Sequence, residues 1–378
     1  MLSGNKMKLL IVGGTGVLSS AVVAEALGKG MDVSIINRGN RKGRIPAGVE
    51  HIKADIKDTD YIKSVLAGRH FDAVVDFLCY NKKQIEYSLE LFKDVAGQYV
   101  FISTACVYDT SIPGLKTEDS QKGFKDWNYS TEKWECEQYL TRKAVEYGMD
   151  YSIVRPCVTY DDTRIPYGIM PPYGYHWTLA ARILNGKPVI TWDGGKARWS
   201  MMRVEDFAVG VVGLVGNPKA YGEAFNICGD KADSWNEVLD TLGIILGREV
   251  IKVDVPSEKL KKYCPGRAGE IAGRALDSVI DNSKIKSLVP EFQQRISLEE
   301  GMGRTVEAYK KQSYQKGIDW RFDAQWDFII NKENKTGNQV KAGFVNYYST
   351  AQLKDIVSYH LVLYKDSFFV KLYNKLKK

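Results

Sequence analysis

The chain contains a tyrosine and a lysine at a spacing suited to proton transfer. Tyr129 and Lys133 are four residues apart, so on a helix they share one face. A neighbouring ammonium group lowers the pKa of a phenol, which makes tyrosine usable as an acid or base near neutral pH. Two other pairs have the same spacing, Tyr139 with Lys143 and Tyr373 with Lys377. Only the first pair follows the strand-like segment FISTACVY at a distance of about 25 residues, and in that segment Thr104 can offer a hydroxyl to the reacting oxygen.

A glycine-rich turn near the start of the chain predicts a dinucleotide site. GGTGVLS places Gly13, Gly16 and Ser19 at three-residue steps, after the apolar run KLLIV and before a helix-like stretch. Glycines let the backbone turn tightly and approach a pyrophosphate, whose charge is held by main-chain amides and the positive helix end. Ser19 stands where a third glycine often occurs, but it is small enough for close packing. The alternative is a turn with a structural role only.

The end of the second predicted strand favours NADP over NAD. An NAD site usually has an acidic residue there for the ribose 2′-hydroxyl, whereas this chain has Asn37 and Arg38. A guanidinium suits a 2′-phosphate by its charge and its fork of donors. The alternative is a solvated loop arginine, because Arg41 and Arg44 lie nearby.

The elements that position these residues alternate along the first 156 residues. Apolar runs predict strands at 8–12, 32–37, 51–55, 71–78, 98–104 and 150–156. Amphipathic stretches predict helices at 17–29, 59–67, 81–95 and 130–147. Strands that are apolar on both faces and separated by helices form a parallel sheet covered on both sides. The pattern therefore predicts an α/β fold with a doubly wound sheet.

Changes in composition predict further domains. Segments such as RIPYGIMPPYGYHW, within 157–200, exclude a regular core helix because proline removes a donor and clashes, so we interpret this stretch as substrate-facing. We expect a dinucleotide-binding domain and a substrate-binding domain, followed by a basic C-terminal extension, over residues 1–165, 166–330 and 331–378. The helix-like 204–215 and strand-like 223–228 suggest that 204–230 rejoins the first domain.

Length and composition narrow the class of protein. With 378 residues, 44% hydrophobic and 26% charged, the chain has the composition of one large or two unequal globular domains. No window approaches 18 uninterrupted apolar residues and no signal peptide is recognisable, so we expect a cytoplasmic location. The six cysteines are widely spaced without C-x-x-C, and there are only four histidines, which argues for free thiols and against a metal site.

The positive charge is concentrated at one end of the chain. The formal net charge is +7, but residues 331–378 hold nine lysines against three acids, a local net of +6. The rest of the chain is therefore almost neutral, which argues against a nucleic-acid partner.

The same 48 residues carry an apolar stripe whose structure the pattern leaves open. The stripe has helical spacing and consists of Leu353, Val357, Leu361, Tyr364, Phe368, Leu372 and Leu376, although 360–373 can equally be read as a hairpin. As a helix it would gather Lys365, Lys371, Lys375, Lys377 and Lys378 toward its end. Such an element can lie on an anionic membrane surface. The alternative is that the stripe packs on the body or on a sister subunit.

Taken as a set, the motifs resemble those of extended short-chain dehydrogenase/reductases, the NAD(P)-dependent sugar-nucleotide epimerase/dehydratase family. They are the glycine turn, Ser-Thr-x-x-Val-Tyr at 103–108, Tyr129-x-x-x-Lys133, Arg155-Pro156, WDGGKARWSMMRVEDFAVGV and GEAFNICG, within about residues 7–310. The resemblance implies a Rossmann-type sheet with a smaller α/β substrate-binding domain, and a homodimer. It implies hydride transfer at a carbon of a nucleotide-activated sugar. Tyr129 would be the acid/base, Lys133 would bind the nicotinamide ribose, and Thr104 would orient the substrate.

The expected cofactor contacts follow the carboxyl ends of the predicted strands. Asp55 is placed to accept from the adenine amine, and Phe77 and Leu78 to line the cleft. The full set is Gly13, Thr15, Gly16, Val17, Leu18, Arg38, Asp55, Ile56, Phe77, Leu78, Tyr129, Lys133, Pro156 and Val158.

Departures from the family pattern narrow the range of reactions that we expect. The family's 4,6-dehydratases have an Asp-Glu pair where this chain has Ala105 and Cys106, so dehydration is disfavoured. A cysteine at that place occurs in 3,5-epimerases and in the epimerase/reductases that make GDP-fucose, where it exchanges a proton beside a ketone, with a histidine partner about where His176 lies. The alternatives are a small buried hydrophobe for Cys106, and a diphosphate-contacting or loop histidine for His176.

The sequence leaves two features of the predicted substrate site unassigned. Tyr160-Asp161-Asp162 replaces the family's usual Tyr-Gly-Pro, which leaves the sugar-binding loop unassigned. Arg198 is a candidate for the substrate diphosphate, where a bidentate fork is useful, or else a partner in a surface ion pair.

The sequence therefore predicts an NAD(P)-dependent epimerase or keto-reductase of a nucleotide-activated sugar. The alternative is a non-catalytic nucleotide- or RNA-binding protein on the same scaffold, since fold does not fix function and NRGNRK at 37–42 resembles that branch. Thr104, Tyr129 and Lys133 together favour catalysis.

Overall fold

The computed structural model describes residues 6–311, 317–333, 343–346 and 351–376, and the chain forms two compact units. The first unit consists of Met1–Tyr160, Trp199–Ala232 and Leu276–Ser297. The second consists of Asp161–Arg198, Asp233–Ala275 and Leu298–Lys378. The chain thus returns to the first unit twice, and the sequence had not predicted the return at 276–297.

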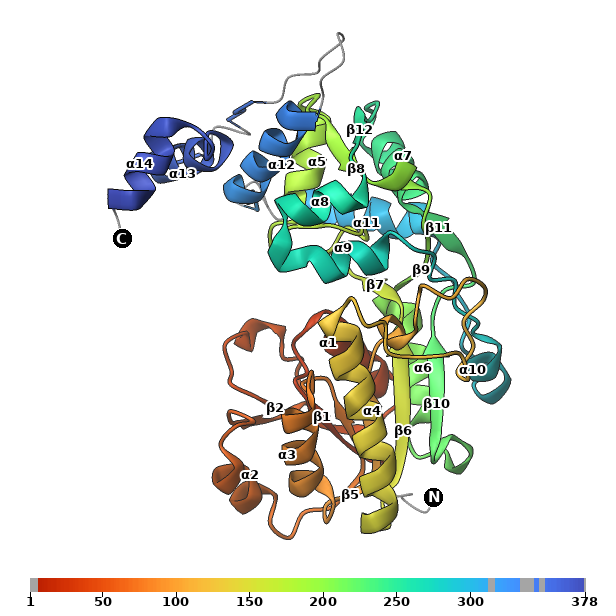
Figure 1. The fold of residues 1–378 in the computed structure, drawn as a ribbon. Helices are drawn as coiled ribbons and strands as arrows, with labels where there is room; N and C mark the ends of the chain where they lie inside the picture. The colour runs from red at the N-terminus through yellow and green to blue at the C-terminus, as the bar shows by residue number, and fades with distance from the viewer. Residues whose placement is uncertain (1–5, 312–316, 334–342, 347–350, 377–378) are drawn as a thin grey trace. The chain divides into compact units, whose positions relative to one another are not determined.

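A seven-stranded sheet organises the first unit (Figure 1). Its strands are β1 (Lys8–Val12), β2 (Asp32–Asn37), β3 (Glu50–Lys53), β4 (Phe71–Asp76), β5 (Ala96–Ile102), β6 (Asp150–Pro156) and β10 (Glu223–Ile227). The strand order is β10-β6-β5-β4-β1-β2-β3, and every neighbouring pair is parallel. This is the Rossmann-type doubly wound arrangement, so the predicted fold class is confirmed.

Helices cover both faces of this sheet. In chain order they are α1 (Val17–Gly28), α2 (Thr59–Leu66), α3 (Lys82–Phe92), α4 (Asn128–Tyr147) and α6 (Val204–Leu214). Because side chains alternate along a strand, β1 sends Leu9 and Ile11 into an apolar cluster with α1 and α6. Its other side chains, Leu10 and Val12, enter a second cluster with α2, α3 and α4. All four are fully buried, which explains why the strand reads as a continuous apolar run.

Shorter elements complete the first unit. They are η1 (Lys42–Arg44), η2 (Ala105–Val107), β7 (Val158–Tyr160), β9 (Arg198–Arg203), η4 (Pro218–Ala220) and α10 (Ser283–Leu288). β7 and β9 pair in parallel. The expected strand 98–104 ends two residues early, at Ile102, so Thr104 lies just beyond the sheet.

The second unit is mainly helical. Its elements are α5 (Trp177–Leu184), β8 (Val189–Thr191), η3 (Asp193–Gly195), β11 (Ala232–Ser234), α7 (Trp235–Leu246), β12 (Lys252–Asp254), α8 (Ser257–Tyr263), η5 (Pro265–Arg267), α9 (Ala268–Arg274), α11 (Leu298–Lys311), α12 (Trp320–Glu333), α13 (Leu353–Leu363) and α14 (Phe368–Leu376). β8 and β12 pair in parallel. The rings of Tyr167, Trp192 and Trp235 pack edge-on or tilted in its core.

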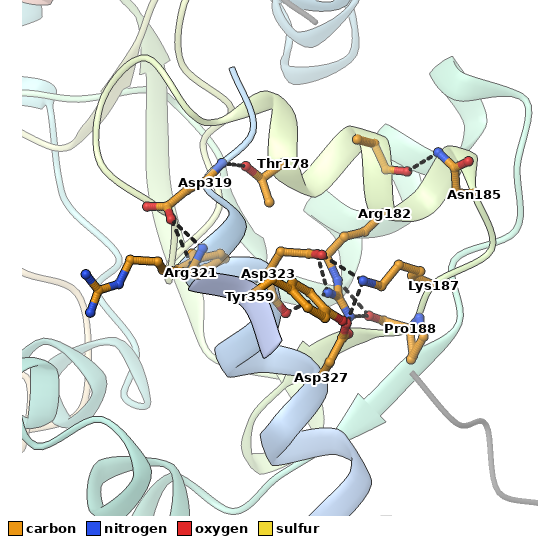
Figure 2. Close-up of polar contacts among 12 residues, drawn as sticks. Thr178, Arg182, Asn185, Lys187, Pro188, Asp319, Arg321, Asp323, Asp327 and Tyr359 are labelled. Atoms are coloured by element: carbon orange, nitrogen blue, oxygen red, sulfur yellow. Dashed lines mark hydrogen bonds and ion pairs between the residues drawn. The ribbon is translucent and has the colours of Figure 1, made fainter. Parts of the chain in front are cut away.

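Four charged side chains and a tyrosine form a buried cluster in the second unit (Figure 2). Arg182 of α5 approaches Asp323 Oδ1 at 2.5 Å and Asp327 Oδ1 at 2.8 Å. Lys187 Nζ lies 2.7 Å from Asp323 Oδ2 and 2.6 Å from Asp327 Oδ2. The hydroxyl of Tyr359 donates to Asp327. All five residues are at most 5% exposed, and the two cations balance the two carboxylates.

This cluster shows how the C-terminal region is attached. Asp323 and Asp327 belong to α12, and Tyr359 belongs to α13, so within the second unit α13 packs on α12. Residues 353–376 form two helices instead of a hairpin, separated by Tyr364–Ser367. Lys377 and Lys378 lie outside the described residues.

Candidate active site

The glycine turn has a backbone that requires glycine. Gly13 and Gly14 have φ values of +117° and +77°, which side chains rarely adopt. A Cβ on Gly14 would lie 2.6 Å from Ile35 Cγ2. A Cβ on Gly13 would lie 3.6 Å from Phe77 Cβ and 3.7 Å from Leu78 Cδ2. The turn is therefore a close-packed cradle beside the carboxyl ends of β1 and β4, and these residues fit a dinucleotide.

The start of α1 leaves main-chain amides for a ligand. Gly16 is the N-cap, and its N–H donates to Ser19 Oγ at 2.9 Å. Ser19 therefore caps the helix as well as being small. The amides of Val17 and Leu18 follow in the first helical turn, where backbone donors have no partner inside the helix. They are the donors that would face a pyrophosphate.

Residues after β2 connect the glycine turn to the neighbouring strands. Asn37 Nδ2 donates to Gly13 O at 2.7 Å, and Asn37 Oδ1 lies 3.0 Å from His51 Nε2. Arg41 Nη1 donates to Thr15 O at 3.2 Å, whereas Arg38 is exposed. Sequence reasoning missed the roles of Asn37 and Arg41. An amide side chain at the end of a buried strand was the available signal.

The other expected cofactor residues follow neighbouring strands. Asp55 is exposed and accepts a hydrogen bond from Lys57 N–H at 3.0 Å, while Ile56 is partly buried. Pro156 ends β6, and Val158 begins β7, and both are buried.

Lys133 of α4 points to the carboxyl ends of β4 and β5. Its Nζ donates to Ile102 O at 2.9 Å and to Cys79 O at 2.5 Å. The residue is 2% exposed, and burial lowers the pKa of its ammonium group. An ammonium group has three donors, so two carbonyls orient Lys133 and a third N–H is available to a ligand hydroxyl.

Tyr129 and Thr104 lie in the same part of the first unit. The expected helix at 130–147 starts two residues earlier, at Asn128, which places Tyr129 in its first turn and Lys133 one turn later. Tyr129 is partly buried, with its ring 5.7 Å from that of Trp127. Thr104 is buried, and its Oγ1 accepts from Cys106 N–H at 3.1 Å, which caps η2. The hydroxyl keeps a proton that it can donate to a substrate oxygen.

The other tyrosine–lysine pairs have different surroundings. Lys143, near the end of α4, forms an ion pair with Glu146 at 2.5 Å. Tyr139 lies beneath the cations of Lys82 and Arg142. Lys377 and the side chain of Tyr373 lie outside the described residues.

A buried polar network supports the active-site side of α4. Glu137 lies one turn after Lys133 and accepts from Ser103 Oγ at 2.5 Å. It also accepts from Arg155 Nε at 3.0 Å and Nη2 at 2.6 Å. Arg155 Nη1 donates to the Tyr108 hydroxyl at 2.8 Å. Sequence reasoning treated Arg155 only as a motif residue, although an arginine inside an apolar strand requires a buried acceptor.

The residues expected to exchange a second proton belong to different units. Cys106 is a partly buried cysteine in η2 of the first unit that forms no disulfide. His176 precedes α5 in the second unit, is 3% exposed, and accepts from Ile165 N–H through Nδ1 at 3.1 Å. Burial, with a contribution from Arg164, lowers the pKa of His176 to about 3, so the ring is neutral at pH 7. Their pairing stays a prediction, as does the role of the exposed Arg198.

Comparison with known proteins places this arrangement in a family. The profile of the NAD dependent epimerase/dehydratase family matches residues 9–228, which is more than half of the chain. The chain therefore belongs to this family of extended short-chain dehydrogenase/reductases.

Two curated relatives illustrate the range of similar proteins. The chloroplast stem-loop binding protein of 41 kDa b from Arabidopsis thaliana is 26% identical over 242 residues, covering 61% of this chain and 60% of that protein. The 2'-dehydrokanamycin reductase of Streptomyces kanamyceticus is 20% identical over 289 residues, covering 76% of this chain and 81% of that protein. The match therefore spans less than two thirds of the first relative.

Solved structures share the fold. UDP-glucose 4-epimerase from Thermotoga maritima, solved with UDP-glucose, has a TM-score of 0.67 at 21% identity, covering 81% of this chain and 99% of that one. UDP-glucuronic acid 4-epimerase from Bacillus cereus, solved with UDP-glucuronic acid and NAD, has a TM-score of 0.66 at 19% identity, covering 81% and 100%.

Proposed function

We propose that the protein is an NAD(P)-dependent epimerase or keto-reductase of a nucleotide-activated sugar. The observation that carries the proposal is the position of three residues in the unit that holds the glycine turn. Thr104 lies just after the end of β5, Lys133 of α4 donates to Ile102 O at that strand end, and Tyr129 lies one turn before Lys133. The epimerases and the reductase among the similar proteins support it.

In this proposal, Tyr129, Thr104 and Lys133 have separate roles in the reaction. A bound nicotinamide would supply hydride transfer from a carbinol carbon or to a ketone. Tyr129 takes the hydroxyl proton as the ketone forms, and gives it back when the alcohol is restored. Thr104 donates a hydrogen bond to the same oxygen, and Lys133 binds the nicotinamide ribose and lowers the pKa of the tyrosine. An epimerase returns hydride to the opposite face, whereas a reductase consumes one reduced cofactor per alcohol.

Two finer assignments belong to this proposal. NADP is the preferred cofactor, because Arg38 stands exposed after β2 where an acidic residue would favour NAD. Elimination of water is disfavoured, because Ala105 and Cys106 supply no carboxylate pair.

A substrate panel tests the proposal. The full chain is incubated with UDP-, dTDP- and GDP-sugars and their 4-keto forms, with each nicotinamide cofactor, and products are followed by proton NMR and reduced-nicotinamide absorbance. An epimer without net cofactor consumption indicates an epimerase, and stoichiometric loss of absorbance indicates a reductase. No conversion of any member would overturn the proposal. In deuterated water, incorporation of deuterium at the carbons beside the ketone by wild type but not by Cys106→Ser would support a second proton exchange.

A second candidate is a non-catalytic RNA-binding role, which the similarity to the Arabidopsis stem-loop binding protein favours. Gel-shift titration with a stem-loop RNA at two salt concentrations distinguishes it. Tight, salt-dependent binding that Tyr129→Phe leaves unchanged, together with no turnover, would support this alternative.

A further inference from the structure

Helix α13 uses only one side to pack on the second unit. Tyr359 and Leu363, one turn apart, are buried, and Tyr359 reaches the carboxylate of Asp327 in α12. Lys365 Nζ, just after the helix, donates to Gln325 Oε1 at 3.1 Å. The apolar stripe expected from the sequence is not this buried side.

The stripe instead faces solvent. Its exposed members in the described residues, together with the neighbouring Phe369, are between 43% and 80% exposed: Leu353, Val357, Tyr364, Phe368, Phe369 and Leu372. Isolated exposed apolar residues are ordinary, but six within twenty positions are not.

Helix α14 has the side-chain arrangement of an interfacial helix. At 100° per residue, Phe368, Phe369 and Leu372 fall within one arc, and Lys371 and Lys375 border that arc. Both lysines are exposed. Ser367 stabilises the start of the helix by accepting from Val370 N–H at 3.3 Å. The helix is thus formed and capped with its apolar arc in water.

We propose that α14, with the exposed stripe of α13, is a docking surface for an anionic lipid bilayer. The apolar arc would enter the headgroup boundary while the lysines contact lipid phosphates. The charge of 331–378, nine lysines against three acids, complements such a surface. No helix in the described part of the chain is long and apolar enough to cross a membrane, so the protein would lie on the surface.

Charge is also the reason for favouring lipid over a second copy of the chain. Lysine is depleted in the cores of protein–protein interfaces, and a two-fold contact through α14 would bring the same lysines of both copies together. A bilayer with anionic headgroups removes the apolar arc from water and neutralises the lysines at the same time.

Vesicle flotation with the full chain tests this surface. Vesicles of phosphatidylcholine alone are compared with vesicles containing phosphatidylglycerol, at low and high salt. We expect at least about tenfold stronger partitioning to the anionic vesicles, weakened by salt. Phe368→Ser with Phe369→Ser, and separately Lys371→Glu with Lys375→Glu, should each lower it by about tenfold or more. These side chains are exposed, so the variants should keep the wild-type circular dichroism.

A matched control uses exposed apolar residues elsewhere. Val145→Ser with Ile244→Ser removes two side chains that are 79% and 74% exposed on α4 and α7, and should leave partitioning unchanged. Equal binding to both vesicle types, or no binding by wild type, would overturn the proposal. A concentration-dependent dimer in light scattering that is lost in the phenylalanine variant, without vesicle binding, would assign the surface to self-association instead.

Discussion

Glu137 and Arg155 form an ion pair with side chains only 1% and 4% exposed, and this pair joins α4 to β6. Glu137 also accepts from Ser103, the residue before Thr104, so one carboxylate links the helix of Tyr129 and Lys133 to the turn that carries Thr104. Charges buried in this way need their partners, because removal of one leaves the other unpaired in a low-dielectric interior.

Glu137→Gln should therefore destabilise the first unit strongly. The substitution preserves shape but leaves the Arg155 guanidinium without a counter-charge, a change that typically costs about 3–5 kcal/mol. Urea unfolding followed by tryptophan fluorescence measures the loss. Glu146→Gln, on the same helix, removes an exposed partner of Lys143 and should change stability little. Similar losses of stability in Glu137→Gln and Glu146→Gln would contradict the explanation that burial makes the first substitution costly.

Tyr129→Phe should abolish most turnover while leaving cofactor affinity nearly unchanged. It removes only the hydroxyl that we propose transfers the proton, and general acid–base catalysis typically contributes about 10²- to 10⁴-fold in rate. The matched control is Tyr139→Phe, because Tyr139 lies on the same helix beside Lys82 and Arg142. If Tyr139→Phe were the damaging change, the assignment of the acid/base would be wrong.

Lys133→Ala should impair both cofactor binding and turnover. Its Nζ is held by Ile102 O and Cys79 O at the carboxyl ends of two central strands. Its loss would remove the ribose contact and the positive charge that we propose act together with Tyr129. Kd for the cofactor and kcat for the identified substrate should both worsen. An effect on kcat alone would argue against a contact between Lys133 and the nicotinamide ribose.

Arg38→Ala should weaken NADP by about tenfold or more while leaving NAD unchanged, since a charged hydrogen bond contributes about 1.5–3 kcal/mol. Fluorescence titration of both reduced cofactors measures this. Arg44→Ala, in η1, supplies an exposed arginine as a control. Equal affinities of wild type for NADP and NAD would rule out the preference.

The parts of this fold that depend on local pattern could be predicted from the sequence. The strands at 8–12, 32–37 and 150–156 have the expected bounds, because a strand buried on both faces reads as an uninterrupted apolar run. The glycine turn could also be predicted, since only glycine adopts the backbone conformation of Gly13 and Gly14 without strain.

What the sequence did not reveal depends on packing between distant segments. Glu137 and Arg155 are 18 residues apart and belong to a helix and a strand, and no spacing rule pairs them. The cluster of Arg182 with Asp323 spans 141 residues. The stripe of α13 could be predicted, but the buried side of that helix, with Tyr359 and Leu363, is set by its packing on the distant α12, which includes the hydrogen bond from Tyr359 to Asp327.

His176 should make the protein less stable as the pH falls. Its pKa is about 3 in the folded protein against 6.5 ordinarily, because burial, and secondarily Arg164, disfavour the charged ring. The unfolded chain therefore takes up a proton below pH 6.5 that the folded chain refuses until about pH 3. Stability is unaffected above this window and falls within it, with a slope of up to ~1.4 kcal/mol per pH unit.

The matched measurement compares variants over that pH range. In His176→Asn, the side-chain oxygen can replace Nδ1 as acceptor for Ile165 N–H, and nothing titrates. Urea unfolding between pH 7 and pH 4 should therefore show a shallower loss in His176→Asn than in wild type. His70→Asn, at an exposed position, should retain the wild-type slope. The same slope in all three proteins would contradict the account.

Tyr359→Phe should loosen α13 from the second unit. Asp327 would keep the contacts with Lys187 and Arg182 but lose the donor that α13 contributes, and a hydrogen bond to a charged group is worth about 1.5–3 kcal/mol. Burial raises the pKa of Tyr359, so its hydroxyl is protonated and can donate throughout the physiological range. Local unfolding of the helix would let trypsin cleave after Lys354 and Lys365, which mass spectrometry of limited digests detects. Tyr364→Phe is the control, because that ring is 56% exposed and lies at the start of the connection between α13 and α14. Faster cleavage at these two lysines in Tyr359→Phe alone, with the sheet of the first unit equally resistant in both variants, is the expected result. Equal cleavage in the two variants would mean that apolar packing holds α13 in place without the buried hydrogen bond.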